Sequence, residues 1–226
     1  MSKPHRIILC RHGESEGNVD KSVYRTKPDY AVMLTNRGIE QALDVGRKIK
    51  AIIRDEDYGV YYSPYFRTRQ TMENALTQLT PSICRFKKED PRLREQEYGG
   101  KMRDYDRVAF EEEREEFGKF FYRINGGESP ADCFDRISDF LSTLNRDFSN
   151  KEYPKNIIIS GHGMSNRVFV MRFFHFTMEE FEVWKNPPNG ELYILELHGN
   201  KYKLMTEMKK HPRGYGHVYN PPVKSK

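Results

Sequence analysis

Residues 7–13 read Ile7-Ile8-Leu9-Cys10-Arg11-His12-Gly13, an aliphatic run that stops abruptly at an arginine, a histidine and a glycine. A second aliphatic run, Ile157-Ile158-Ile159, leads to Gly161-His162-Gly163. Unbroken apolar runs of this kind are typical of parallel strands that are buried on both faces. Ligands of open α/β sheets bind at the carboxyl ends of such strands, so we expect the two histidines to face one another across one site.

Composition bounds the class of protein. The chain has 226 residues, a net charge of +5 and 31% charged residues, which predicts a single large domain with a substantial core. Its basic residues are dispersed among 33 acidic ones, and no nucleic-acid-binding module is recognisable, so we expect no nucleic-acid partner. The mean hydropathy of −0.84 and the absence of a long apolar run or a targeting signal predict a cytoplasmic protein with no membrane contact. Oligomeric state is left open.

Strand and helix signals alternate, which predicts a mostly parallel central sheet with helices on both faces. Thr35 is placed to cap one helix, and Ser129-Pro130-Ala131-Asp132 is the capping signal of another. Ser63-Pro64 predicts a third helix, with serine as N-cap and proline at the first helical position, and this places Arg67 in a first helical turn. Further strands are expected at residues 59–62, 82–86 and 192–195 and near 202–205.

Two segments interrupt the alternation of strand and helix signals. The charged and aromatic stretch at about residues 100–128 predicts a small inserted helical cap. Residues 209–226 are basic and rich in proline and glycine, which predicts a flexible tail. We therefore expect one α/β domain over residues 1–208, with the cap inserted in it.

The predicted layout brings a set of polar side chains to the carboxyl edge of the sheet: Arg11, His12, Asn18, Arg67, Glu95 and His162. Such a set suits phosphoryl transfer, which needs an in-line nucleophile, positive charge over the nonbridging oxygens and a proton donor for the leaving oxygen. Imidazole attacks phosphorus near neutral pH, and arginine matches phosphate geometry.

Competing chemistries find little support in the sequence. The histidines are scattered and an arginine adjoins the first of them, so no metal and no other cofactor is expected. Residues 161–165 lack the central serine of the α/β-hydrolase nucleophile elbow. No P-loop or dinucleotide-binding glycine pattern is present.

Four motifs, in order, resemble those of the histidine phosphatase superfamily, which has the phosphoglycerate mutase-like fold. They are Arg11-His12-Gly13-Glu14-Ser15-Glu16-Gly17-Asn18, Ser63-Pro64 with Arg67-Thr68-Arg69-Gln70-Thr71, Arg94-Glu95 with Gly99, and Gly161-His162-Gly163. The resemblance spans about residues 5 to 205. Phe121-Tyr122-Arg123 and residues 127–136 look most like a plant and fungal subgroup of phosphoglycerate mutase-like proteins.

The resemblance implies a role for each residue. His12 is the nucleophile that becomes phosphohistidine, and Arg11, Arg67 and His162 hold the phosphoryl oxygens. Asn18 adds a neutral donor. Glu95 aligns with the family's proton donor, with Glu97 as the rival acid. In the cap, Arg103, Arg107 and Arg123 are candidates for substrate contact, against the alternative of exposed solubilising charges.

We therefore expect a metal-independent phosphomonoester hydrolase, a histidine phosphatase of the acid phosphatase type, that acts on a small phosphorylated substrate. Cofactor-dependent phosphoglycerate mutases typically carry tryptophan where this chain has Gly17, and the small residue predicts a roomier, wetter site. The alternatives are a phosphoglycerate mutase or sugar bisphosphatase, or a protein that binds a phosphorylated ligand without turnover.

Overall fold

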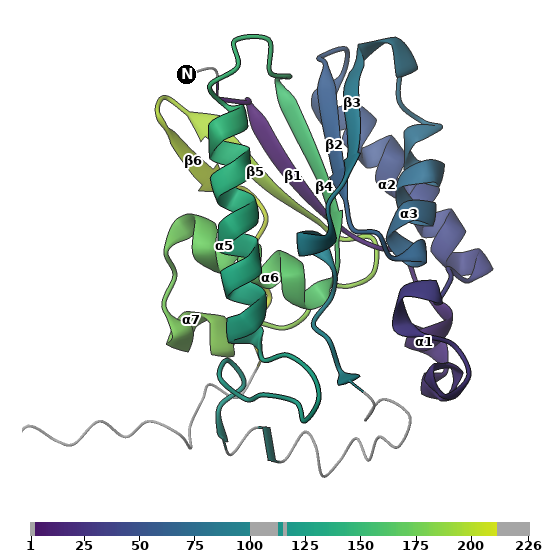
Figure 1. Ribbon diagram of the computed structural model, residues 1–226. Coiled ribbons are helices and arrows are strands. Elements are labelled where there is room, and N and C mark those ends of the chain that lie inside the picture. Colours follow the sequence, from purple (N-terminus) through teal and green to yellow (C-terminus); the bar gives the residue numbers. More distant parts are fainter. Residues whose placement is uncertain (1–2, 100–112, 115–116, 212–226) are drawn as a thin grey trace, which may run out of the picture.

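A computed structural model describes residues 3–99, 113–114 and 117–211 of the chain. Its centre is a six-stranded sheet in the order β3-β2-β4-β1-β5-β6 (Figure 1). The strands are β1 (Arg6–Arg11), β2 (Tyr58–Tyr62), β3 (Cys84–Glu89), β4 (Asn156–Gly161), β5 (Leu192–His198) and β6 (Lys201–Leu204). Strands β1 to β4 pair in parallel, and β5 and β6 are antiparallel. The mostly parallel sheet expected from the sequence is confirmed.

The pairing of β1 with β4 positions the site. Ile7 to Arg11 lie opposite Ile157 to Gly161 in parallel register, so both strands end at the same level. His12 and His162 are the next residues of the two strands. The two aliphatic runs are fully buried, as expected of central strands covered on both faces.

Helices cover both faces of the sheet, as expected. Figure 1 shows α5 (Pro130–Asp147) and α6 (Gly163–Phe174) on one face and α2 (Asn36–Ile53) and α3 (Phe66–Leu76) on the other. Each layer has its own core: Ile7, Leu9 and Ile159 pack towards α5 and α6, whereas Ile8, Cys10 and Ile158 pack towards α2 and α3. This alternation explains why the strands are apolar at every position.

The capping predictions are confirmed at two helices and wrong at the third. The hydroxyl of Thr35 accepts the Gly38 N–H at the start of α2, and Ser129 forms a capping box with Asp132 at the start of α5. Helix α3 begins at Phe66 with Tyr65 as N-cap, not at Pro64 with Ser63 as cap. The Ser63 N–H donates to the Ser160 carbonyl, which extends the pairing of β2 with β4 by one residue and keeps Ser63 outside the helix.

The segment between β1 and α2 contains short helices that the sequence did not indicate: α1 (Glu16–Val19) and the 3₁₀ turns Lys21–Arg25 and Asp29–Ala31. Further 3₁₀ turns lie at Pro81–Ile83 and Pro91–Leu93, and the short helix α7 (Met178–Glu182) follows α6. Several of these segments bring polar groups to the carboxyl edge of the sheet.

Most of the predicted cap and tail lies outside the described residues. This includes Arg103 and Arg107, whereas Arg123 is exposed and forms an ion pair with Asp132. At the start of the tail, Lys209 accepts the Lys185 N–H and the His211 N–H donates to Val183. Among the described helices, none is both long and apolar enough to cross a membrane.

Candidate active site

The two histidines that follow β1 and β4 form the centre of the site. Their ring centroids lie 5.2 Å apart, with the ring planes at 64° to each other. Both side chains are buried, His12 at 3% exposure and His162 at 0%. The prediction that they face one another at one edge of the sheet is confirmed.

The carbonyl oxygen of Gly13 fixes the tautomer of His12. Its Nδ1 lies 2.7 Å from the carbonyl oxygen of Gly13. A carbonyl oxygen only accepts hydrogen bonds, so Nδ1 carries the proton and Nε2 keeps its lone pair. Burial, followed by the charges of Arg67 and Arg11, holds the pKa of His12 well below its usual value. His12 is therefore a neutral imidazole with a free nitrogen.

His162 is the N-cap of α6, and its side chain contacts Ser63. The distance between His162 Nε2 and Ser63 Oγ is 2.8 Å. Burial lowers the pKa of His162 well below its usual value, with Arg67 as the next largest cause. The Tyr65 ring packs edge-on against the imidazole at 5.1 Å, so the ring is held from two sides by residues that connect β2 to α3.

Two arginines bring positive charge to the histidines. Arg67, in the first turn of α3, is buried at 3% exposure and donates through Nη1 to the backbone oxygen of Asp29 at 2.7 Å and to its carboxylate at 2.8 Å. Arg11 ends β1 and donates through Nη1 to the carbonyl oxygen of Pro187. Each guanidinium is thus held through one nitrogen and has others to offer to a ligand.

Two buried nitrogens of this group have no hydrogen-bond partner among the described residues. They are Nε of Arg11 and Nδ1 of His162. Nε of Arg11 always carries a proton, and Nδ1 of His162 carries one in the tautomer in which Nε2 accepts from the Ser63 hydroxyl. A buried donor without an acceptor is costly, and phosphate oxygens are acceptors that match such donors. Desolvation also lowers the pKa of Arg11, although a guanidinium stays protonated across the physiological range. The site is therefore suited to an anion.

A loop before β5 supports the first motif. Asn189 donates through Nδ2 to the carbonyl oxygens of His12 and Gly13 and to Oδ1 of Asn18. The Gly190 N–H also donates to the His12 carbonyl. Since Oδ1 of Asn18 accepts from Ser15 as well, Nδ2 is the group through which Asn18 would contact a ligand, as its predicted role requires.

Glu95 reaches the same edge from the loop after β3. Its carboxylate accepts the N–H groups of Met164 at 3.1 Å and Ser165 at 3.3 Å, at the start of α6. The positive end of a helix favours a carboxylate at this position. The rival acid, Glu97, accepts the N–H of Gly99 instead. The Glu95 carboxylate is thus bonded to the start of the helix that His162 caps, so its position leaves it the candidate acid.

The space beside Gly17 is occupied, so the expected roomier site is wrong at this position. A Cβ at residue 17 would lie 2.2 Å from the hydroxyl of Tyr24. Tyr24 is 9% exposed, and burial raises the pKa of its hydroxyl to about 12, a shift that the charge of Arg67 opposes. Thus a tyrosine from the following 3₁₀ turn fills the volume that a larger residue would take.

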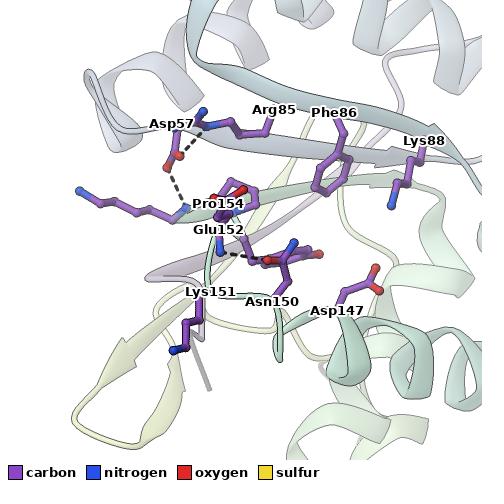
Figure 2. Close-up of a pocket in the computed structure, with 11 residues that line it drawn as sticks. Asp57, Arg85, Phe86, Lys88, Asp147, Asn150, Lys151, Glu152 and Pro154 are labelled. Atoms are coloured by element: carbon purple, nitrogen blue, oxygen red, sulfur yellow. Dashed lines mark hydrogen bonds and ion pairs between the residues drawn. The ribbon is translucent and has the colours of Figure 1, made fainter.

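A pocket of about 700 Å³ lies at the opposite end of the strands (Figure 2). Arg85, Phe86 and Lys88 of β3 line it, together with Asp147 at the end of α5 and the loop before β4. Asp57, which also lines it, accepts from Arg85 and from the Lys155 N–H. This pocket contains none of the predicted site residues. Within the described residues, no group of three or more histidine, cysteine or acidic side chains is arranged to hold a metal ion.

Comparison with known proteins identifies the family. Residues 7–208 match the family model of the histidine phosphatase superfamily, branch 1. The chain belongs to the histidine phosphatase superfamily. Enzymes of this superfamily characteristically work through a phosphohistidine, and the histidine phosphatase recognised from the four sequence motifs is confirmed.

Two relatives of this histidine phosphatase illustrate its place in the superfamily. It is 40% identical over 214 residues to the phosphoglycerate mutase-like protein AT74 of Arabidopsis thaliana, covering 89% of this chain and 68% of the relative. It is 26% identical over 303 residues to the broad-range acid phosphatase DET1 of Saccharomyces cerevisiae, covering 92% of this chain and 91% of the relative. The predicted plant and fungal affinity agrees with these matches.

Solved structures confirm the fold. A structure named mycobacterial hydrolase 1 superposes with a TM-score of 0.70 at 17% identity, covering 92% of this chain and all of the other. A vanadate complex of mycobacterial glucosyl-3-phosphoglycerate phosphatase superposes with a TM-score of 0.67 at 18% identity, covering 88% and 96%. The histidine phosphatase fold extends over nearly the whole chain.

The sequence did not reveal the residues that hold the predicted set in place. These are Asp29 against Arg67, Ser63 against His162, and Asn189 against the first motif. Asp29 carries no distinguishing pattern in the sequence, and the motif that contains Ser63 indicated a helix cap and not a contact with His162. The run Asn186-Pro187-Pro188-Asn189-Gly190 is a turn signal, and it would have drawn attention to that loop.

Proposed function

We propose that this protein is a metal-independent phosphomonoester hydrolase in which His12 is transiently phosphorylated. The hydrogen bond between His12 Nδ1 and the Gly13 carbonyl supports this most directly, because it leaves Nε2 unprotonated and available to attack phosphorus. The positive charge that a phosphoryl group requires comes from Arg11 and Arg67, so the chemistry needs no metal ion.

In the first step, the lone pair of His12 Nε2 forms a bond to phosphorus while the bond from phosphorus to the substrate's bridging oxygen breaks. The electron pair of that bond remains on the leaving oxygen, which takes a proton from Glu95. Arg11, Arg67, His162 and the amide of Asn18 stabilise the nonbridging oxygens. The products of this half are an alcohol and phosphohistidine.

In the second step, Glu95 accepts a proton from a water molecule whose oxygen attacks phosphorus. The bond between phosphorus and Nε2 breaks, its electron pair returns to His12, and inorganic phosphate leaves. The carboxylate at the start of α6 is then protonated again, ready for another substrate.

The substrate that fits this proposal is a small phosphomonoester, encountered in the cytoplasm. The name of the yeast relative, a broad-range acid phosphatase, supports hydrolysis of such esters. The lowered pKa of His12 supports activity at acid pH, since the nucleophile stays neutral there.

The test is hydrolysis of p-nitrophenyl phosphate from pH 4 to 8 in the presence of EDTA. We expect turnover by the native protein and trapping of an acid-labile, base-stable phosphoenzyme, and we expect both to be lost in His12→Ala. His5→Ala, which removes a half-exposed histidine paired with Glu56, is the matched control and should retain full activity.

Substantial activity of purified His12→Ala would refute the proposed nucleophile. Loss of activity in EDTA that returns with a divalent metal would refute the metal-independent chemistry. Interconversion of 2- and 3-phosphoglycerate faster than any phosphate release would identify a mutase instead.

A further inference from the structure

Arg136 of α5 and Glu128 of the loop before α5 form a buried ion pair. The pair contacts the loop that carries Glu95 and has no part in the proposed chemistry. Arg136 Nε lies 3.1 Å from Oε1 of Glu128, and its Nη2 lies 3.0 Å from Oε2. The two side chains are 10% and 14% exposed. This bidentate geometry is the strongest that an arginine and a carboxylate adopt.

The remaining donors of Arg136 hold the backbone of the Glu95 loop. Nη1 donates to the carbonyl oxygens of Arg92 at 2.6 Å and Arg94 at 2.8 Å, and Nη2 donates to the carbonyl of Glu95 at 3.1 Å. One planar guanidinium thus contacts three carbonyls within four consecutive residues. A lysine ammonium is a single point of charge and cannot reproduce this set.

Glu128 holds the same loop from its other side. Its carboxylate accepts from Nη2 of Arg94 at 2.7 Å and from the N–H of Glu97 at 3.0 Å. Its backbone exchanges further hydrogen bonds with Glu97 and with the amide side chain of Gln96. Every residue from 94 to 97 is therefore bonded to Arg136 or Glu128.

The consequence concerns where the Glu95 carboxylate lies. A loop has no hydrogen-bond ladder of its own, so its path is set by whatever satisfies its backbone groups. Here that path carries the Glu95 carboxylate to the N–H groups of Met164 and Ser165, next to His162. A displacement of about 1 Å is enough to impair proton transfer severely.

We propose that Arg136 and Glu128 are positioning residues for proton transfer by Glu95. The inference rests on the proposed function, because it requires Glu95 to protonate the leaving oxygen while His12 Nε2 takes the phosphoryl group. The pair acts through the loop backbone and leaves the arginines of the phosphate pocket unaffected.

Such a role predicts a dependence on the leaving group. The p-nitrophenolate anion is stable, so breaking its bond to phosphorus needs little help from an acid. An alkoxide is a poor leaving group and depends strongly on protonation, to which a positioned acid contributes about 10²–10⁴-fold. Misplacing Glu95 should therefore impair alkyl phosphate hydrolysis far more than aryl phosphate hydrolysis.

The experiment compares kcat/KM for p-nitrophenyl phosphate and for glycerol 2-phosphate, because kcat/KM includes only the steps up to cleavage of the phosphorus–oxygen bond. The proteins are native, Arg136→Lys and Glu95→Gln, with Arg146→Lys as the matched control on the exposed side of α5. We expect Arg136→Lys to lose about 10-fold or more on glycerol 2-phosphate and at most about 3-fold on p-nitrophenyl phosphate. Glu95→Gln should show the same pattern more strongly, and Arg146→Lys should match the native protein.

The outcomes separate two failures. Suppose that Glu95→Gln lowers kcat/KM more for glycerol 2-phosphate than for p-nitrophenyl phosphate, as expected. If Arg136→Lys then lowers kcat/KM for both substrates by the same factor, or changes it for neither, the positioning role is wrong and the proposed function stands. If Glu95→Gln itself lowers both equally, the proton donor is assigned wrongly. Should Arg136→Lys fail to fold by circular dichroism, Glu128→Gln, which preserves the shape of the partner, is judged by the same comparison.

Discussion

The hydroxyl of Ser63 lies 2.8 Å from Nε2 of His162, and this hydrogen bond joins the end of β2 to the start of α6. Ser63 continues the extended path of β2, since its N–H bonds to the Ser160 carbonyl. The strand thus delivers a hydroxyl to the imidazole, and the helix that follows begins three residues later. Ser63 therefore orients His162 and does not cap α3.

Replacing Ser63 by alanine should misorient His162 without unfolding the protein. The lost hydrogen bond should lower kcat/KM for an aryl phosphate by about 10-fold, the equivalent of one good hydrogen bond. Steady-state kinetics and the thermal midpoint measure the two effects. The matched control is Ser160→Ala, because the hydroxyl of Ser160 is buried and has no partner among the described residues. That change should leave activity intact, and an equal loss in both variants would contradict the role of Ser63.

Replacing Asn189 by alanine should displace His12, the proposed nucleophile, through its backbone. The Asn189 side chain donates to the carbonyls of His12 and Gly13 and to Asn18, so its removal frees the loop that follows β1. We expect kcat/KM to fall by about 10- to 100-fold, as small displacements of reacting groups do. Asn145→Ala on the exposed face of α5 serves as control. Unchanged kinetics of Asn189→Ala would show that residues 11–18 keep their conformation without the hydrogen bonds from Asn189.

Because Gly13 has no side chain, its backbone can lie against the backbone of Gly38, where any other residue would clash. A Cβ there would lie 2.3 Å from the carbonyl oxygen of Gly38 at the start of α2. Gly13→Ala should therefore cost about 1–3 kcal/mol of unfolding free energy and also lower the affinity for phosphate. Gly46→Ala creates a similar clash with the Ala75 carbonyl, away from the histidines. Urea denaturation should show both losses of stability, while phosphate titration should distinguish them; equal phosphate affinity in the two variants would count against this placement of Gly13.

Acid pH should destabilise the protein through its two buried histidines. The pKa values of His12 and His162 are held well below 6.5 in the folded state, mainly by burial, whereas unfolding restores ordinary values. As pH falls through 6.5, the two histidines therefore become protonated in the unfolded chain while they remain neutral in the folded protein. Stability is complete above that pH and declines below it, by about 1.4 kcal/mol per pH unit for each histidine. Urea titrations at pH 7.5 and 5.5 measure this, and His162→Gln should lose about half of the difference. A pH-independent midpoint in the native protein would contradict the neutral pair.

The sequence predicted the main elements of the site because their signals are local. Two fully apolar runs indicated central strands, and each ended at a histidine, so their convergence followed from the rule that parallel strands end at one edge. Arg67 was placed correctly in a first helical turn even though its helix starts later than Ser63-Pro64 suggested. That error arose because a serine before a proline is a local capping signal, whereas strand pairing with β4 is a distant contact that overrides it.

By itself the sequence determined the edge of the sheet at which the two histidines lie and predicted the residues to which we assign the chemistry, since strand burial and helix entry depend on neighbouring residues. Only the tertiary structure decided how those residues are held. Asp29 is hydrogen-bonded to Arg67 across 38 positions of sequence, and Asn189 to His12 across 177. Arg136 is hydrogen-bonded to the carbonyl of Glu95 across 41. The space beside Gly17 is filled by the hydroxyl of Tyr24, only seven positions further along the chain, because the short helices between them turn the chain back on itself. Such contacts leave no periodic trace along the chain, because a hydrogen-bond partner is selected by the packing of whole elements and not by sequence spacing.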